Sequence, residues 1–209
     1  MGGLGFVVVI VLYVWLAVAV VKAYWRRNWK SGTAALAVMI LLPTTDAVIG
    51  RLYLKHLCAT EGGLHVKQVV KEVEGFYGGV TTKDFPNYYG YTFVEGSSNA
   101  MPRPPDAVER FIIRDGNVVK EDPVPPMSLY ELVHVKQKRG PYFDETSWIV
   151  LQRSDHSELG RYDVFTFRGG WAEWLLGGFA DGRDSVAVCG NIPFHGEKIV
   201  VQNTLIPNR

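Results

Sequence analysis

The chain opens with a long apolar run. Residues 6–21 read FVVVIVLYVWLAVAVV without a charge, and uncharged residues 3–5 lengthen the run. About 20 apolar residues in a helix span the hydrocarbon core of a bilayer. The run ends in a mixture of cations and aromatics that is typical of the membrane–water boundary, namely Lys22, Tyr24, Trp25, Arg26, Arg27 and Trp29. The pattern predicts a first transmembrane helix, followed by a basic loop, within residues 1–31.

A second apolar segment, TAALAVMILL, occupies residues 33–42. As a helix it rises only about 15 Å, half a bilayer, so the helix either continues beyond Pro43 or ends early. We expect it to continue, because a proline kink frees only one carbonyl, that of Met39, and local hydroxyls can satisfy such groups. The prediction is a second transmembrane helix within residues 32–60, kinked near Pro43.

Two charged residues follow Pro43 in this segment, Asp46 and Arg51. Asp46 either caps the helical turn after Pro43 or contacts a partner subunit, as carboxylates in membrane spans often do. The two residues lie roughly 140° apart around a helix and are poorly placed to pair, so we expect Arg51 to extend toward the lipid headgroups. Pro43, Asp46 and Arg51 are therefore candidate contacts with membrane or partner.

The orientation follows from the loop 22–32, which holds four basic residues and no acid. The positive-inside rule places such a loop in the cytoplasm. The N-terminus and everything after the second helix would then lie in the periplasm of a bacterium. The predicted localisation is the inner membrane, with the lipid bilayer as one partner.

The chain has two cysteines, Cys58 and Cys189, and both follow the second apolar segment. On this topology both lie in an oxidising compartment, where two cysteines most often pair. The sequence therefore predicts a disulfide between Cys58 and Cys189, although two unrelated thiols remain the alternative.

Residues 61–209 show strand patterns separated by turn signals. Residues 110–121 hold two β-type runs around an Asp-Gly-Asn turn, and residues 146–153 and 161–168 predict a second hairpin. We also expect strands within residues 64–73, 129–138, 185–189 and 198–202. The predicted fold class is two transmembrane helices plus a mainly antiparallel β (α+β) domain.

Two further segments of this domain are less regular. Residues 80–107 are irregular, with several prolines, and are expected to form a loop or an excursion from the sheet. The stretch GGWAEWLLGG at residues 169–178 predicts a short helix, since Trp171 and Trp174 are three apart. Exposed tryptophans mark interfaces, so these two are interface candidates, with a packed helix as the plainer interpretation.

The distribution of charged residues along the chain limits the classes of partner that we expect. Residues 1–54 hold 5 of the 22 basic residues and 1 of the 21 acidic ones, which leaves 17 basic and 20 acidic residues for 55–209. The latter part is mildly acidic, so a nucleic-acid partner is not expected.

Reaction motifs are not evident. The five histidines and two cysteines form no CxxC, CxxCH or HExxH pattern, and no nucleophile elbow or phosphate-binding glycine loop occurs. We expect no metal and no cofactor, and no catalytic residue can be assigned.

The run Gly50-Arg51-Leu52-Tyr53, with Leu57-Cys58 and Glu61-Gly62 after two apolar segments, resembles uncharacterised two-helix envelope proteins of Proteobacteria over about residues 5–75. The resemblance implies an inner-membrane setting and no activity. The leading hypothesis is an anchored accessory or scaffold protein whose periplasmic domain binds another protein. The alternatives are an anchored hydrolase-type enzyme and a thiol-redox protein that uses Cys58 and Cys189.

Overall fold

The computed structural model describes residues 3–79, 83–97, 107–169, 187–189 and 196–208. The chain forms two compact units. Unit 1 comprises residues 1–60, 138–145 and 165–190, and unit 2 comprises residues 61–137, 146–164 and 191–209. Strands β8 (Phe143–Gln152) and β9 (Glu158–Phe167) contribute residues to both units.

Unit 1 contains a helical hairpin of α1 (Gly3–Arg27) and α2 (Trp29–Thr60). Asn28 alone separates the helices, and its Oδ1 accepts a hydrogen bond from the Lys30 N–H at 3.1 Å. A side-chain acceptor two residues before the donor is the geometry of a helix N-cap. The helices approach closely here, because a Cβ on Gly32 would lie 2.7 Å from the Trp25 ring.

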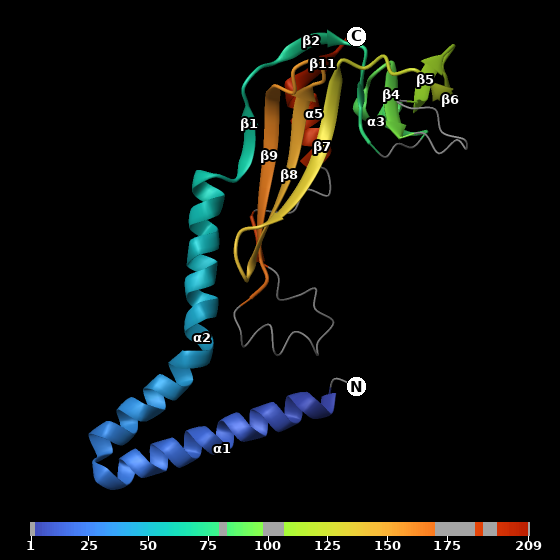
Figure 1. Cartoon of the computed structure of the whole chain (residues 1–209). Coiled ribbons are helices and arrows are strands. Elements are labelled where there is room, and N and C mark those ends of the chain that lie inside the picture. The colour runs from blue at the N-terminus through green and yellow to red at the C-terminus, as the bar shows by residue number, and fades with distance from the viewer. Residues whose placement is uncertain (1–2, 80–82, 98–106, 170–186, 190–195, 209) are drawn as a thin grey trace. The chain divides into compact units, whose positions relative to one another are not determined.

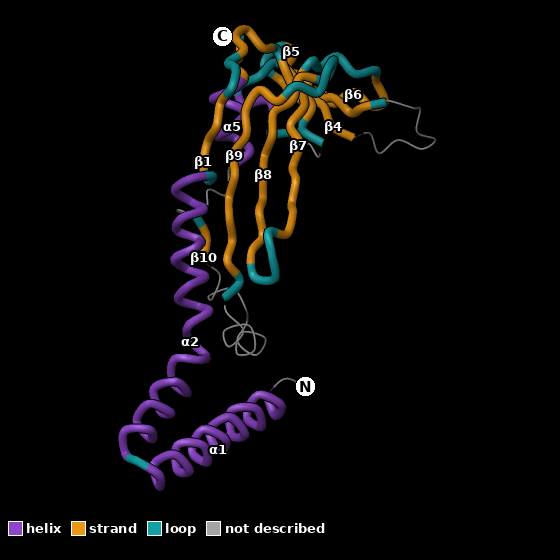
Figure 2. The backbone as a smooth tube through the Cα atoms, turned by 60° about the vertical axis from the view of Figure 1, so that its left-hand side comes forward, coloured by secondary structure: helices purple, strands orange, loops and turns teal. Residues whose placement is uncertain are grey.

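Helix α2 continues through Pro43 and changes direction part-way along its length (Figures 1 and 2). Proline has no N–H to donate to the carbonyl four residues earlier. In α2 that carbonyl belongs to Met39, and the Tyr13 hydroxyl of α1 donates a hydrogen bond to it. The Thr45 hydroxyl donates to the Leu41 carbonyl at 2.6 Å. The prolonged helix predicted from the sequence is therefore present, and its freed carbonyl is satisfied by the neighbouring helix.

The predicted transmembrane pair is nevertheless wrong. Among the residues described, no helix is both long enough and apolar enough to cross a bilayer. The fold class with two membrane helices is corrected accordingly. So are the inner-membrane localisation, the periplasmic N-terminus and C-terminal domain, and the cytoplasmic loop 22–32.

A small apolar cluster completes unit 1. Strand β10 (Ala187–Val188) pairs antiparallel with the end of β9, where Ala187 faces Phe167. Buried Leu54 and Leu57 of α2 pack with Phe165 and Phe167. A disulfide joins Cys58 to Cys189 beside this cluster, as the cysteine argument predicts, with 5.4 Å between the Cα atoms. The end of α2 is thus tied covalently to the residue that follows β10.

Unit 2 is built on a mixed sheet. Its strand order is β1-β9-β8-β7-β3-β4-β5-β6, and the separate pair β11-β2 is parallel. The strands not yet bounded are β1 (Gly63–Val66), β2 (Val70–Val73), β3 (Gly75–Tyr77), β4 (Phe93–Ser97), β5 (Val108–Arg114), β6 (Asn117–Val124), β7 (Tyr130–Lys138) and β11 (Leu205–Pro207). Two short helices, α3 (Phe85–Tyr89) and α5 (Gly196–Thr204), accompany the sheet.

The core of unit 2 lies between α5 and the strands it covers (Figure 1). Val200 and Val201 of α5 are fully buried against Val150 of β8 and Leu159 of β9. The aromatic residues Phe76, Tyr89 and Tyr91 extend this core, and the Tyr91 hydroxyl donates to the Leu205 carbonyl. These contacts anchor both α5 and the C-terminal strand to the sheet.

The predicted hairpins are confirmed. Strands β5 and β6 pair from Arg114↔Asn117 onward, and Asp115 and Gly116 form the turn with positive φ angles of 51° and 78°. Glycine and aspartate tolerate this region better than other residues. Strands β8 and β9 are neighbours in the sheet, as the second hairpin requires.

Two local predictions are wrong. Residues 198–202, expected as a strand because of their valines, lie inside helix α5, where Val200 and Val201 face the core. Burial against the sheet overrides the weak β preference of the segment. Residues 80–107, expected as a loop, contain helix α3 and strand β4 among their described residues.

Candidate functional site: the open edge of β7

Among the residues that the structure describes, strand β7 has a neighbouring strand along its whole length on one side only. Strand β8 lies on one side of it, while on the other side β3 pairs with β7 at a single position, Tyr77↔Glu131. Beyond that position, Figures 1 and 2 show no other described strand alongside β7. We refer to residues 132–136 as the open edge. An open strand edge presents a row of backbone N–H and C=O groups to any chain that can pair with it.

The start of β7 is held by a buried carboxylate, Glu95 of β4. Glu95 faces Arg110 across the β4–β5 pair, and its Oε1 accepts hydrogen bonds from Arg110 Nε at 2.8 Å and Nη2 at 2.6 Å. The backbone N–H groups of Met127 and Ser128, just before β7, donate to the same carboxylate at 2.9 and 3.0 Å. Glu95 therefore fastens the segment that leads into β7 to the neighbouring strands.

Burial alone would raise the pKa of Glu95, because water is excluded from the carboxylate. The hydrogen bonds from Ser128, Met127 and Arg110 outweigh burial and hold the pKa below its ordinary value of 4.5. Glu95 is therefore an ionised structural anchor at neutral pH and not a proton donor.

One face of the open edge is fixed by aromatic packing. The His134 ring stacks on Trp148 of β8, with ring centroids 5.3 Å apart and an interplanar angle of 14°. Trp148 in turn packs under the start of α5, since a Cβ on Gly196 would lie 2.7 Å from its ring. The histidine is thus held on the face that α5 covers.

The side chains of the open edge alternate between the two faces of the sheet, as in any strand. Lys136 lies two residues beyond His134, hence on the same face, and is exposed. Val133 and Val135 belong to the opposite face, and Val135 is 36% exposed. Leu132, on the same face as His134, packs against the core. Beyond it the edge therefore offers His134 and Lys136 on one face and Val133 and Val135 on the other, with no acidic residue between 132 and 137.

The other two edges of this sheet are less suited to pairing. Strand β6 carries Pro123, which has no N–H to donate, and Lys120 is engaged by Glu109 at 3.0 Å and Asp122 at 3.2 Å. Strand β1 is only 4 residues long. Prolines, engaged charges and short strands are common ways to block a sheet edge.

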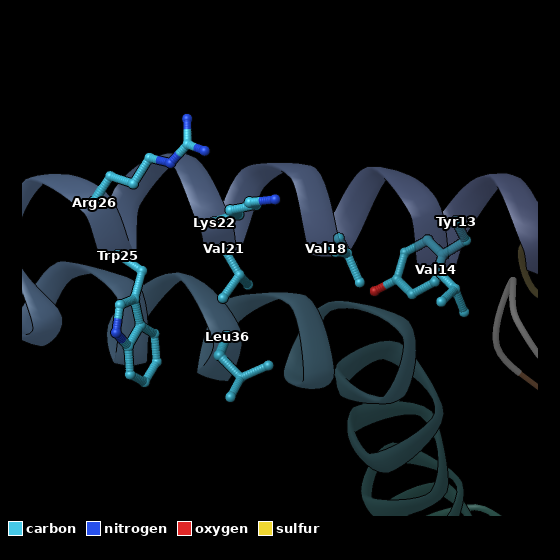
Figure 3. Close-up of a pocket in the computed structure, with 9 residues that line it drawn as sticks. Tyr13, Val14, Val18, Val21, Lys22, Trp25, Arg26 and Leu36 are labelled. Carbon is cyan, nitrogen blue, oxygen red and sulfur yellow. The ribbon is translucent and has the colours of Figure 1, made fainter.

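Each unit has a hollow among its described residues. One, of about 210 Å³, lies beside the lead-in to β7 and is lined by residues of mixed polarity, among them Glu72, Phe93, Ser128 and Leu129. The other is an apolar groove of about 530 Å³ in unit 1, between α1 and α2. Figure 3 shows Val18, Val21 and Trp25 directed toward α2, while Arg26 points away from it.

The residues singled out from the sequence do not gather at the open edge. Pro43, Asp46 and Arg51 are in α2, where Asp46 Oδ1 accepts a hydrogen bond from the Ala47 N–H at 2.8 Å and Arg51 is exposed. Cys58 and Cys189 form the disulfide. Trp171 and Trp174, with the predicted helix 169–178 around them, lie outside the described residues.

Metal and cofactor sites have no candidate among the residues placed by the structure. No group of three or more His, Cys, Asp or Glu side chains there is arranged to hold a metal ion. Tyr89, Tyr91 and Glu95, whose pKa values are shifted, are not suited to acid–base chemistry near neutral pH. Burial raises the pKa of Tyr89 and Tyr91 above 10, and that of Glu95 is lowered.

Comparison with known protein families, with curated proteins and with solved structures finds no match. The resemblance to two-helix envelope proteins therefore stays a prediction.

The sequence did not reveal the open edge. The alternating pattern of residues 129–138 predicts a strand, but edge status depends on the length of the neighbouring strand. Strand β3 has only 3 residues, and its pairing with β7 joins segments more than 50 residues apart. The available signal was the absence of proline and acid from residues 132–137, which marks an unblocked strand.

Proposed function

We propose that this chain is a protein-binding module that captures an extended segment of a partner protein by strand addition along the open edge of β7. The observation that supports this most is the single pairing of β7 with β3 at Glu131. Strand addition draws its affinity from main-chain hydrogen bonds and its specificity from alternate side chains.

The surroundings of the edge favour binding over catalysis. The buried ionisable group nearest to the start of β7, Glu95, is committed to Arg110 and to two backbone N–H groups. A general acid or base needs a pKa near the working pH, and the shifts of Glu95, Tyr89 and Tyr91 lead away from neutrality. Glu95 instead gives β7 a fixed starting point, and a rigid edge lowers the entropic cost of binding.

The test starts from a displayed library of random peptides. We expect peptides rich in β-branched residues to be enriched on the full chain. Their site is then mapped with two proline variants, His134→Pro and Val135→Pro. Successive residues of a strand direct their N–H groups to opposite sides, so one variant removes a hydrogen bond to β8 and the other removes an outward donor.

The variant that keeps the unfolding temperature of the parent chain is the informative one, and it should abolish peptide binding. The matched control is the tolerated member of the pair Val118→Pro and Val119→Pro on the β6 edge, which should leave binding unchanged. Failure to enrich any peptide, or loss of binding only in the β6 variant, would refute the proposal.

A further inference from the structure

We infer that the segment bound along β7 is an alternating strand with acidic residues on one face and apolar residues on the other. This inference rests on the proposed function and adds the class of partner.

The charge of the open edge favours an acidic residue in the partner. Lys136 is the one lysine of the edge, which has no arginine, and it lies on the same face as His134. In a paired strand the directly opposite residue projects to the same face, about 5 Å away, and opposite charges there are favourable. A carboxylate is therefore the side chain best matched to the position opposite Lys136.

The opposite face of the open edge favours apolar residues in the partner. Val133 and Val135 fall between the polar positions, and Val135 keeps more than a third of its surface exposed. Apolar and β-branched residues pair well across strands with valine. The partner positions beside these valines should be apolar, so acidic and apolar residues alternate along the bound segment.

A second copy of this chain is poorly suited to pair with the open edge. Residues 132–137 contain a lysine and a histidine but no acid. Two such edges would bring together cationic side chains without a compensating carboxylate, an arrangement that disfavours self-pairing. The same lysine would thus discourage self-association and favour an acidic partner.

The experiment uses three short peptides that alternate valine with glutamate, glutamine or lysine, titrated against the full chain by fluorescence anisotropy. We expect the glutamate peptide to bind tightest and the lysine peptide weakest. Lys136→Glu should weaken binding of the glutamate peptide by about tenfold, as loss of one cross-strand charge pair and gain of a repulsion implies. It should leave the glutamine peptide within about twofold. Lys71→Glu, an exposed lysine of β2, is the matched control and should change neither.

The possible outcomes test the acidic preference and the strand addition separately. Equal binding of all three peptides would overturn the acidic preference while leaving strand addition intact. Binding of none of them would overturn both. Concentration-dependent dimerisation in analytical ultracentrifugation that Val135→Pro or His134→Pro abolishes would show that a second copy is the occupant, and would overturn the inference.

Discussion

At the scale of single residues, two polar groups of this protein, the Glu95 carboxylate and the Met39 carbonyl, take their hydrogen-bond partners from other elements. Glu95 is fully buried yet has Arg110 and two backbone donors. The Met39 carbonyl, deprived of its helical donor by Pro43, receives the Tyr13 hydroxyl. Leaving such a group without its partner costs more than the net value of one hydrogen bond, so these are the positions where a single atom matters most.

Glu95→Gln should destabilise unit 2 by roughly 1.5–3 kcal/mol at pH 7, because it removes the charge from several hydrogen bonds. The pKa of Glu95 is lower in the folded chain than in the unfolded one. Its contribution is therefore complete above pH 4.5 and is lost as the pH falls through the folded value. Denaturant titrations at pH 7 and pH 3 should show the difference between variant and parent shrinking at pH 3. A difference that is constant or larger at pH 3 would contradict this role.

Tyr13→Phe should weaken the α1–α2 hairpin by about 1–3 kcal/mol, because it removes the hydroxyl of α1 that donates to the Met39 carbonyl of α2. The measurement is the free energy of unfolding followed by far-UV circular dichroism. Tyr24→Phe removes a hydroxyl from the same helix at a side chain that is 51% exposed, and it should be neutral. Equal effects of the two substitutions would show that the hydroxyl of Tyr13 is not specifically needed.

At the scale of elements, close approach of backbones decides how β3 sits beside its neighbours. Strand β3 pairs in parallel with β4, and Gly75 lies opposite Phe93. A Cβ on Gly75 would lie 2.3 Å from the Phe93 carbonyl oxygen, whereas one on Gly78 would meet its nearest neighbour at 3.4 Å. Because β3 is also the strand that ends beside Glu131, its position sets where the open edge begins.

Gly75→Ala should therefore destabilise unit 2 by roughly 1–3 kcal/mol, the usual cost of overpacking where backbone cannot yield. Gly78→Ala adds the same methyl group at ordinary contact distance and should change the unfolding free energy by less than about 0.5 kcal/mol. Thermal unfolding of both variants against the parent chain compares them directly. If Gly78→Ala proves the more damaging, the packing described for β3 and β4 is incorrect.

Elements with strong local signals could be predicted from the sequence, and those set by distant contacts could not. The β5–β6 turn has Gly116 where a positive φ is needed, and that signal is purely local. Residues 198–202 carry valines that suggest a strand, yet burial of Val200 and Val201 against β8 and β9 requires a helix. The open edge was missed for the same reason, because it depends on where β3 ends.

At the scale of the whole molecule, the disulfide is the longest covalent constraint. Cys58 and Cys189 are 131 residues apart in the sequence and lie beside the cluster of Leu54, Leu57, Phe165 and Phe167. The pairing was predicted from the presence of two cysteines together with an oxidising compartment, and that compartment was inferred from the membrane topology that is now corrected. The membrane helices predicted with it are wrong, because no helix among the described residues is both long enough and apolar enough to cross a bilayer.

Replacing both cysteines, Cys58→Ser with Cys189→Ser, should lower the unfolding free energy by at most about 4–5 kcal/mol, the chain-entropy value for a loop of this length. Guanidinium titrations of parent and variant, each with and without reductant, supply the measurement. Reductant should destabilise the parent and leave the variant unchanged. A parent chain that is insensitive to reductant under unfolding conditions would contradict a stabilising bridge.

The most direct test of the open edge is residue-resolved hydrogen exchange of β7, in the free chain and with the alternating valine–glutamate peptide. In the free chain, alternate amides within residues 132–136 should exchange quickly, because they face outward, while those between them are protected by β8. Adding the peptide should slow the fast set selectively. Protection of every amide of this stretch in the free chain would show that the edge is already covered, and would contradict strand addition as the function.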